Sequence, residues 1–240
     1  MLPSIAPSLS VITTTDPVAG QLPLLIASLR QLARSQRWQV ELVIVDDLGQ
    51  WRSSAPPPSA GSELSLVLLS PWQRQGQAAA LELGIHASRA PTLLTIDPDL
   101  HPCVGELPAL LAKLAGPVQM VHGVRPERTD SSALRRCGSR VTNWLVSAII
   151  DVHITDLGSP VTALHRSTLA HLATLPTGCA NPRLYLYGLL GDAVVCHRLV
   201  RGSPATVPSQ YSFFQLVRVM WRLLHDSRII RRALRTRRQP

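Results

Sequence analysis

The chain has 240 residues, 45% of them hydrophobic, which is typical of one main packed domain and excludes a disordered chain. Its formal net charge of +9 comes almost wholly from arginine, because Lys113 is the one lysine, and the planar guanidinium suits phosphate groups. Nucleotide phosphates, anionic lipids or nucleic acid are therefore candidate partners, although codon usage in the host would give the same arginine bias.

The cysteines and the apolar runs give expectations about the cellular compartment. The four cysteines are scattered without a C-x-x-C pair, which argues against a zinc cluster and against a disulfide framework. No run reaches the roughly 18 uncharged apolar residues of a membrane-spanning helix. The first residues also lack the basic start and apolar core of a signal peptide. We therefore expect a cytoplasmic protein that does not cross the membrane.

Strand and helix patterns alternate along the first half of the chain. Continuous apolar runs predict strands at 9–14, 40–45, 64–69, 92–96 and 118–121. Helical periodicity or a run of alanine and leucine predicts helices at 22–32, 77–87 and 106–114. This alternation predicts an α/β fold with an open, mainly parallel sheet covered by helices on both faces.

The second half of the chain is less regular. Its patterns predict helices at 132–150 and 167–175, a loop entering a strand at 156–164, a strand at 193–200 and a helix at 211–238. Proline, glycine and asparagine interrupt every pattern over 176–192, so no element is predicted there.

Acidic side chains follow two of the predicted strands. Asp46 and Asp47 end the run at 40–45, and Asp97 and Asp99 end the run at 92–96. Ligands of such sheets collect beyond the carboxyl ends of the strands, so these acids should share one crevice. Carboxylates two residues apart suit Mg²⁺ or Mn²⁺, although an isolated D-x-D also occurs in capping turns. His101 is either a further ligand, which would favour Mn²⁺, or an exposed loop histidine.

These acids belong to an ordered series of motifs. The series is VIVDD at 43–47, RQG at 74–76, DPDLHP at 97–102, GVRPER at 123–128, SR at 139–140, NWL at 143–145, DLGS at 156–159 and a weak SQY at 209–211. The order resembles that of family 2 glycosyltransferases, and within them the dolichyl- or polyprenyl-phosphate sugar synthases. The resemblance covers roughly residues 9–212.

The resemblance implies a GT-A fold over 1–208, with a Rossmann-like nucleotide-sugar domain, followed by a basic helix and tail over 209–240. It implies a UDP- or GDP-hexose donor, a polyprenyl phosphate acceptor and inversion at the sugar. The implied nucleotide contacts are Thr13, Thr15, Ile44, Asp46, Asp47, Arg74 and Asp97. The implied ligands of Mg²⁺ or Mn²⁺ are Asp97, Asp99 and His101.

The arginines after the predicted strand at 118–121 have an implied role at the acceptor. Arg125, Arg128 and Arg140 would hold its phosphate, and Asp99, Arg125 and Arg128 would be catalytic. A phosphate monoester is already anionic, so it needs positioning more than deprotonation. The alternative is that these arginines are ordinary solvated side chains.

The sequence departs from the family pattern in places. Leu48-Gly49-Gln50-Trp51 replaces the usual Gly-Ser-x-Asp, Thr162 stands where the family often has an arginine, and a lysine expected near the phosphates is missing. Two alternatives therefore stay open, namely the same fold with a soluble acceptor and a degenerate glycosyltransferase that serves as a membrane-associated scaffold.

The predicted helix at 211–238 combines apolar bulk with many arginines. These are Arg218, Arg222, Arg228, Arg231, Arg232, Arg235, Arg237 and Arg238. A basic amphipathic helix can lie on an anionic membrane surface, which gives an expected location at the inner face of the membrane. The alternative is a helix that packs on the core and carries a solvated basic tail. Nucleic acid is not an expected partner, because the basic run lacks interleaved aromatic residues.

Overall fold

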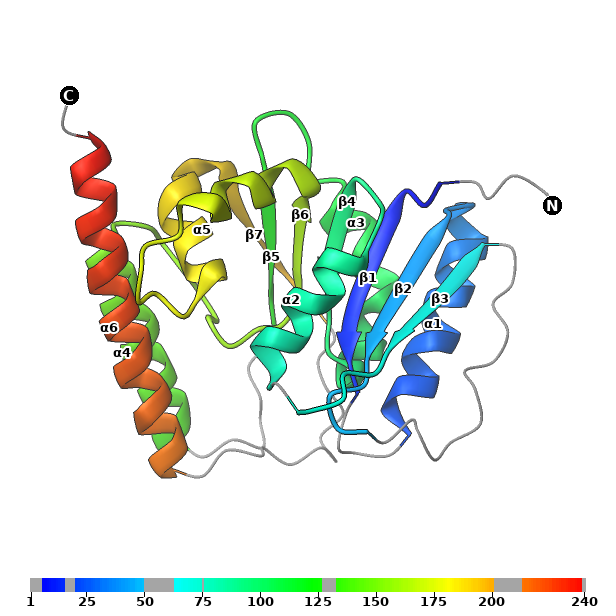
Figure 1. Cartoon of the computed structure of the whole chain (residues 1–240), viewed down its shortest axis with the longest axis horizontal. Coiled ribbons are helices and arrows are strands. Elements are labelled where there is room, and N and C mark those ends of the chain that lie inside the picture. Colours follow the sequence, from blue (N-terminus) through cyan, green and yellow to red (C-terminus); the bar gives the residue numbers. More distant parts are fainter. Residues whose placement is uncertain are drawn as a thin grey trace.

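A mixed sheet organises the computed structural model, which describes residues 6–15, 20–49, 63–74, 76–126, 133–200 and 213–238 (Figure 1). The strands in these ranges are β1 (Leu9–Thr14), β2 (Val40–Val45), β3 (Leu64–Leu69), β4 (Thr92–Thr95), β5 (Met120–Val124), β6 (Thr162–His165) and β7 (Val194–Arg198). Their order is β3-β2-β1-β4-β6-β5-β7. Strand β6 is antiparallel to β4 and to β5, and the other neighbours are parallel. The predicted mainly parallel sheet is confirmed.

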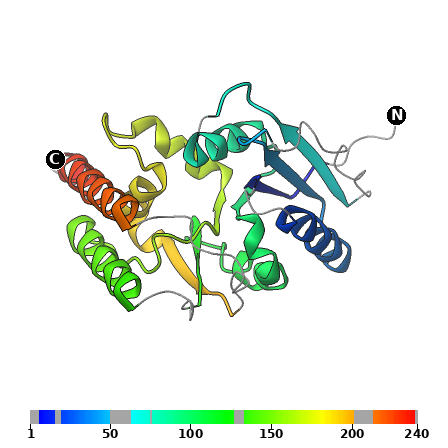
Figure 2. The same ribbon diagram turned by 90° about the horizontal axis from the view of Figure 1, so that it is seen from below.

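Helices cover both faces of the sheet (Figure 2). The α-helices are α1 (Gln21–Gln36), α2 (Gln77–Ala87), α3 (Leu107–Leu111), α4 (Ala133–Ile150), α5 (Pro182–Leu190) and α6 (Phe213–Arg238). The 3₁₀ segments are η2 (Pro98–Glu106), η3 (Arg166–Thr174) and η4 (Gly191–Ala193). Every residue of β1 and β2 is buried, as continuous apolar runs between two layers of helices require.

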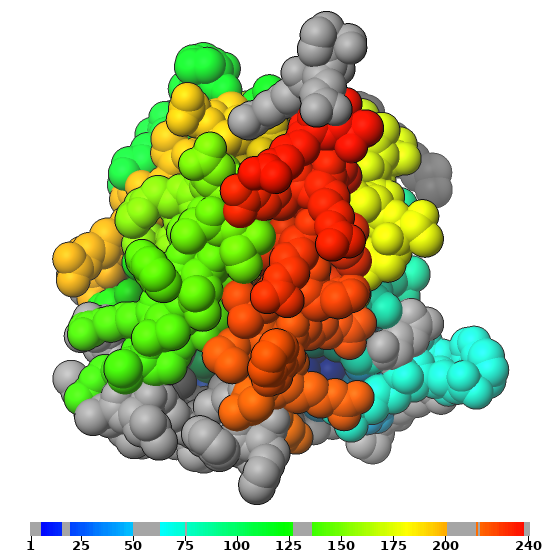
Figure 3. Space-filling model, turned by 90° about the vertical axis from the view of Figure 1, so that its left-hand side faces the viewer, coloured from blue at the N-terminus to red at the C-terminus, as the bar shows by residue number. Residues whose placement is uncertain are grey.

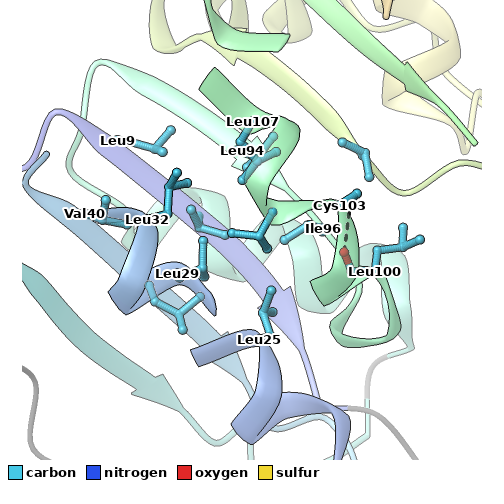
Figure 4. Packing of buried hydrophobic residues seen from close by; sticks show 14 of the residues in the cluster. Leu9, Leu25, Leu29, Leu32, Val40, Leu94, Ile96, Leu100, Cys103 and Leu107 are labelled. Carbon is cyan, nitrogen blue, oxygen red and sulfur yellow. Dashed lines mark hydrogen bonds between the residues drawn. The ribbon is translucent and has the colours of Figure 1, made fainter. Parts of the chain in front are cut away.

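Two apolar cores lie on opposite faces of the sheet. In the first, leucines of α1 such as Leu25 and Leu29 pack against β1, β2 and the segment η2–α3 (Figure 4). In the second, α2, α4, α5 and α6 pack against the other face. Helix α6 contributes Leu224, Ile230 and Leu234 to this second core. The helix therefore packs on the core, as one of the two readings of the sequence predicted.

Several predicted elements differ from those observed. The helix predicted at 106–114 is observed as the shorter α3, and a 3₁₀ segment at Pro98–Glu106 precedes it, because prolines begin and interrupt this stretch. The strand predicted at 118–121 is β5, two residues further along. The unassigned stretch contains α5, whose N-cap Asn181 accepts a hydrogen bond from the Leu184 N–H over 2.9 Å. Asparagine followed by proline is a helix-start signal that the sequence reading missed.

The fit of α2 against the sheet leads to a stability prediction. A Cβ at Gly84 would lie 2.6 Å from Ile12 Cγ2 and 3.1 Å from Val45 Cγ2. We expect Gly84→Ala to lower the free energy of unfolding by about 1–3 kcal/mol, because overpacking forces the helix off the sheet. Urea unfolding at pH 7 measures the change.

Gly138 provides the matched control, because it lies in α4 with nothing within 4 Å of an added Cβ. Gly138→Ala should raise the free energy of unfolding by up to about 1 kcal/mol, since alanine favours the helix. Equal effects of the two substitutions would contradict the packing described for α2.

Candidate functional site

The acids predicted from the sequence flank one central strand at the carboxyl edge of the sheet. Strand β1 lies between β2 and β4, so the residues that follow these two strands emerge on either side of it. Asp46 and Asp47 follow β2 and are buried, and Asp97 follows β4 and is half-buried. Thr15, just after β1, donates from Oγ1 to Asp46 Oδ1 over 3.0 Å. The site is therefore built on the ends of three adjacent strands.

The first residues of α2 join the two pairs of acids. The Gly76 N–H donates to Asp47 Oδ2 over 2.9 Å, and Gln77 Nε2 donates to Asp97 Oδ1 over 3.2 Å. A helix N-terminus carries partial positive charge and stabilises nearby carboxylates. Asp47 and Asp97 are thus held by consecutive residues, although they come from different strands.

Asp99 and His101 lie in the first part of η2 and are half-buried. Burial lowers the pKa of His101, and the nearby Asp99 carboxylate opposes that shift. Among the residues that the structure describes, no three His, Cys, Asp or Glu side chains converge as a metal site. The Asp97 and Asp99 carboxylates still suit Mg²⁺ or Mn²⁺, because such ions take one or two protein carboxylates and complete their shell with substrate phosphates and water. The metal role of His101 stays a prediction.

An ion pair faces these acids from the other side of the site. Arg125 follows β5 and forms a fork on Asp156, from Nε to Oδ2 over 2.9 Å and from Nη2 to Oδ1 over 2.8 Å. Burial alone would raise the pKa of Asp156, but the hydrogen bonds and charge of Arg125 outweigh it, so that pKa is lowered. The charges of Asp97 and Asp99 help to raise the pKa of Arg125. Since β4 and β5 are both antiparallel to β6, they end at the same edge of the sheet, and Arg125 therefore lies at the same edge as these acids.

A second arginine of this region, Arg183, was missed in the sequence. It lies in α5 and donates from Nη2 to the Leu157 carbonyl over 2.6 Å, and from Nη1 to the Ser159 carbonyl. Burial lowers its pKa, while the charges of Asp156 and Asp97 act in the opposite sense. The turn that it holds is tied to β4, because Thr95 Oγ1 donates to the Pro160 carbonyl over 2.7 Å. Asp156 belonged to a recognised motif, whereas Arg183 lay in the stretch without a readable pattern.

The remaining predicted site residues have different surroundings. Thr13 and Ile44 are fully buried inside their strands, and the Ile44 side chain lies in the core beneath α1. A nucleotide contact from Ile44 could therefore come only from its backbone. Arg74 and Arg140 are exposed, and Arg128 lies outside the described residues. The functional roles of these residues stay predictions.

The Arg125–Asp156 pair leads to a prediction about stability and pH. Asp156→Asn should lower the free energy of unfolding at pH 7 by about 3 kcal/mol, because it leaves a largely buried guanidinium without its ion-pair partner. The pKa of Asp156 is lower in the folded protein than in the unfolded chain. Its contribution is therefore complete above the unfolded pKa of about 4 and is lost as the pH falls through the folded pKa.

Urea unfolding of wild type and variant at pH 7 and at acidic pH tests this dependence. The two proteins should converge in stability at low pH. The exposed Asp192→Asn is the control and should change little at either pH. A difference between wild type and Asp156→Asn that grows on acidification would contradict the assignment.

Comparisons with known proteins find chains of similar sequence and similar fold. No family model matches the chain. It is 30% identical over 192 residues to an undecaprenyl-phosphate 4-deoxy-4-formamido-L-arabinose transferase of Pseudomonas aeruginosa, which is 77% of this chain and 54% of that protein. A transferase of the same name from Shewanella sediminis is 28% identical over 213 residues, 85% of this chain and 62% of the relative. The chain thus spans little more than half the length of these relatives.

Among solved structures, glucosyl-3-phosphoglycerate synthase from Mycobacterium tuberculosis superimposes with a TM-score of 0.64 at 22% identity, over 94% of this chain and 80% of that one. The same enzyme in complex with Mn²⁺, UDP-glucose and phosphoglyceric acid gives a TM-score of 0.63 at 20% identity, over 94% and 79%. The chain therefore has the GT-A fold and is a relative of the undecaprenyl-phosphate sugar transferases, which confirms the resemblance that its motifs indicated.

Proposed function

We propose that this protein transfers a hexose from a UDP- or GDP-sugar to a polyprenyl phosphate, with inversion and with Mg²⁺ or Mn²⁺. The observation that carries the proposal is the convergence of Asp46, Asp47 and Asp97 around the start of α2. Its sequence relatives are named for transfer to undecaprenyl phosphate, which supports the choice of acceptor.

The donor half of the proposed site is made of the ends of β1, β2 and β4. Thr15 and Asp46 would face the nucleoside, and the Asp97 and Asp99 carboxylates would hold the divalent cation. When bound, that cation supplies positive charge to the nucleoside diphosphate as it leaves. The hydrogen bonds of Gly76 and Gln77 fix the carboxylates of Asp47 and Asp97 before substrate arrives, so little reorganisation is needed.

The acceptor half would be centred on Arg125. Asp156 occupies one edge of its guanidinium and fixes its orientation, and 27% of the Arg125 side chain remains exposed. Gly158 is exposed beside it, and a Cβ there would lie 3.1 Å from Arg125 Nη2. The missing side chain keeps the exposed part of Arg125 open to solvent. A fixed, partly exposed guanidinium can position an anionic phosphate for attack, which is the main requirement for such a nucleophile.

Contact with the membrane would come from α4 and α6, which lie side by side on one face of the molecule (Figure 3). Each exposes a tryptophan, with 68% of Trp144 and 60% of Trp221 accessible to solvent. No helix in the described ranges has the length and hydropathy to cross a bilayer. Exposed tryptophan and arginine side chains suit the interface of an anionic bilayer, which supports the proposed location at the inner face of the membrane.

The donor site is tested by removing its carboxylates. Asp97→Ala and Asp99→Ala should each lower transfer by at least about 100-fold, because the charge on the leaving diphosphate loses its stabilisation. The measurement is metal-dependent release of UDP or GDP from a panel of nucleotide hexoses, with polyprenyl phosphate as acceptor. A nucleotide donor of the pentose 4-deoxy-4-formamido-L-arabinose, the sugar named for the relatives, is included to test the assignment of a hexose.

Asp192→Ala is the matched control for this experiment, because Asp192 is exposed and precedes β7 at the opposite edge of the sheet. It should retain full transfer. Transfer that persists in both active-site variants would contradict the donor site. Calorimetry in which neither UDP nor GDP binds in the presence of Mn²⁺ would favour a degenerate scaffold protein.

The membrane surface is tested by the double substitution Trp144→Ala and Trp221→Ala. It should weaken binding to phosphatidylglycerol vesicles by at least about 10-fold, because two interfacial aromatic side chains are lost. Transfer to a long-chain acceptor in vesicles should fall, and transfer to a water-soluble short-chain acceptor should persist. Trp72→Ala, which removes an exposed tryptophan from the β3–α2 connection, should bind vesicles like wild type. Equal binding by the double variant would contradict the proposed surface.

A further inference from the structure

The turn at 156–159 has an unusual backbone. Asp156 has a φ of 53°, in the left-handed region that non-glycine residues rarely adopt. Its carbonyl accepts the Ser159 N–H over 2.9 Å and so closes the turn. Strained residues of this kind persist where the surrounding structure holds them, and they often occur at functional sites. The contacts that hold Asp156 in this conformation therefore bear on the function of the site.

Three different elements hold this turn. From β5 and its end, Arg125 binds the Asp156 carboxylate, and His122 Nε2 lies 3.0 Å from the Asp156 carbonyl. From α4, Asn143 Oδ1 accepts the Leu157 N–H over 3.3 Å. From α5, Arg183 donates to the carbonyls of Leu157 and Ser159. Hydrogen bonds from β5, α4 and α5 together fix the backbone of the turn.

The contact to His122 determines the protonation of its ring. A carbonyl oxygen can only accept a hydrogen bond, so Nε2 must carry the proton. Burial, followed by the charge of Arg183, lowers the pKa of His122 to about 4, so the ring is neutral at pH 7. Nδ1 is then a bare acceptor, and it has no partner among the described residues.

The surroundings of His122 are not those of an ordinary apolar core. His122 pairs with Thr162 across β5 and β6, and its ring meets the Tyr187 ring edge-on with centroids 5.5 Å apart. Like His122 Nδ1, the hydroxyls of Thr162 and Tyr187 are buried without a partner in the described part of the chain. Burying unpartnered polar atoms costs stability, so packing alone does not account for a histidine here.

We propose that His122 is a positioning residue of the acceptor half of the site. Its Nε2–H holds the Asp156 carbonyl, which keeps the Asp156 carboxylate on Arg125 and so fixes the orientation of the guanidinium. This role rests on the proposed function, but its geometric part concerns the protein without substrate.

Three substitutions at this position separate the Nε2–H from the bulk of the ring. His122→Gln places an amide N–H near the position of Nε2, whereas the Asn side chain is shorter and that of Leu has no donor. We expect kcat to fall by at least about 10-fold in His122→Asn and His122→Leu, because small misplacements at a site carry large losses of rate. His122→Gln should restore most of the rate, and KM for the nucleotide sugar should change little in all three.

His197→Leu is the matched control, because His197 is a half-buried histidine of neighbouring β7 that pairs with Gly123 and so lies on the opposite face of the sheet from His122. It should keep the wild-type kcat. Thermal unfolding of each variant shows whether the fold is retained. A His122→Leu variant that folds and transfers at the wild-type rate would overturn the proposal, as would a His122→Gln variant that is no better than His122→Asn.

Nuclear magnetic resonance of ¹⁵N-histidine-labelled protein tests the geometry without any substrate. The signal lost in His122→Gln, out of eight histidines, identifies the residue. It should show a neutral ring with the proton on Nε2 and no titration between about pH 5 and 8. A ring protonated on Nδ1, or one that titrates in this range, would overturn the proposal. Absence of transfer by wild type would instead count against the proposed function and would leave this measurement decisive for His122.

Discussion

In a parallel sheet whose two faces are covered by helices, side chains can reach a ligand only beyond the ends of the strands. The strands β1 and β2 are buried along their whole length, so polar groups that must reach a ligand are placed where the strands end. Asp46, Asp47 and Asp97 occupy these ends, and the start of α2 satisfies two of them with hydrogen bonds. The proposed donor site therefore follows from the same burial that stabilises the fold.

The part of the fold that could be predicted is the part in which the local sequence carries a continuous pattern. β1, β2, β3 and α2 are continuous apolar or alanine- and leucine-rich runs bounded by breakers, and their predicted limits agree with the structure. The stretch at 98–106 could not be predicted in this way, because its prolines favour a 3₁₀ segment whose pattern differs little from that of an α-helix. Strand β7 is only half-buried and lacks a strong pattern, but its place was still predicted.

The candidate site likewise has residues that could be predicted from the sequence and residues that could not. Carboxylates directly after buried strands could be placed from the sequence, because strand direction determines where they emerge. The roles of His122 and Arg183 could not, since each depends on a contact with the turn at 156–159, made across 34 and across 24 to 26 residues. The family pattern gave no prediction for Arg183 either, because Thr162 stands where that pattern often has an arginine.

Because β6 runs antiparallel to β4 and β5, it meets the site at its first residues rather than at its last. Strands β1, β2 and β4 contribute to the site through the segments that leave them, whereas β6 contributes the turn that enters it. The acids lie within residues 46–99, and the Arg125–Asp156 pair and its supports lie within 122–183. Each half is therefore encoded in its own contiguous stretch of chain. In the proposed function, recognition of the sugar donor and of the acceptor would therefore depend on different stretches of chain, which meet directly where Thr95 Oγ1 donates to the Pro160 carbonyl.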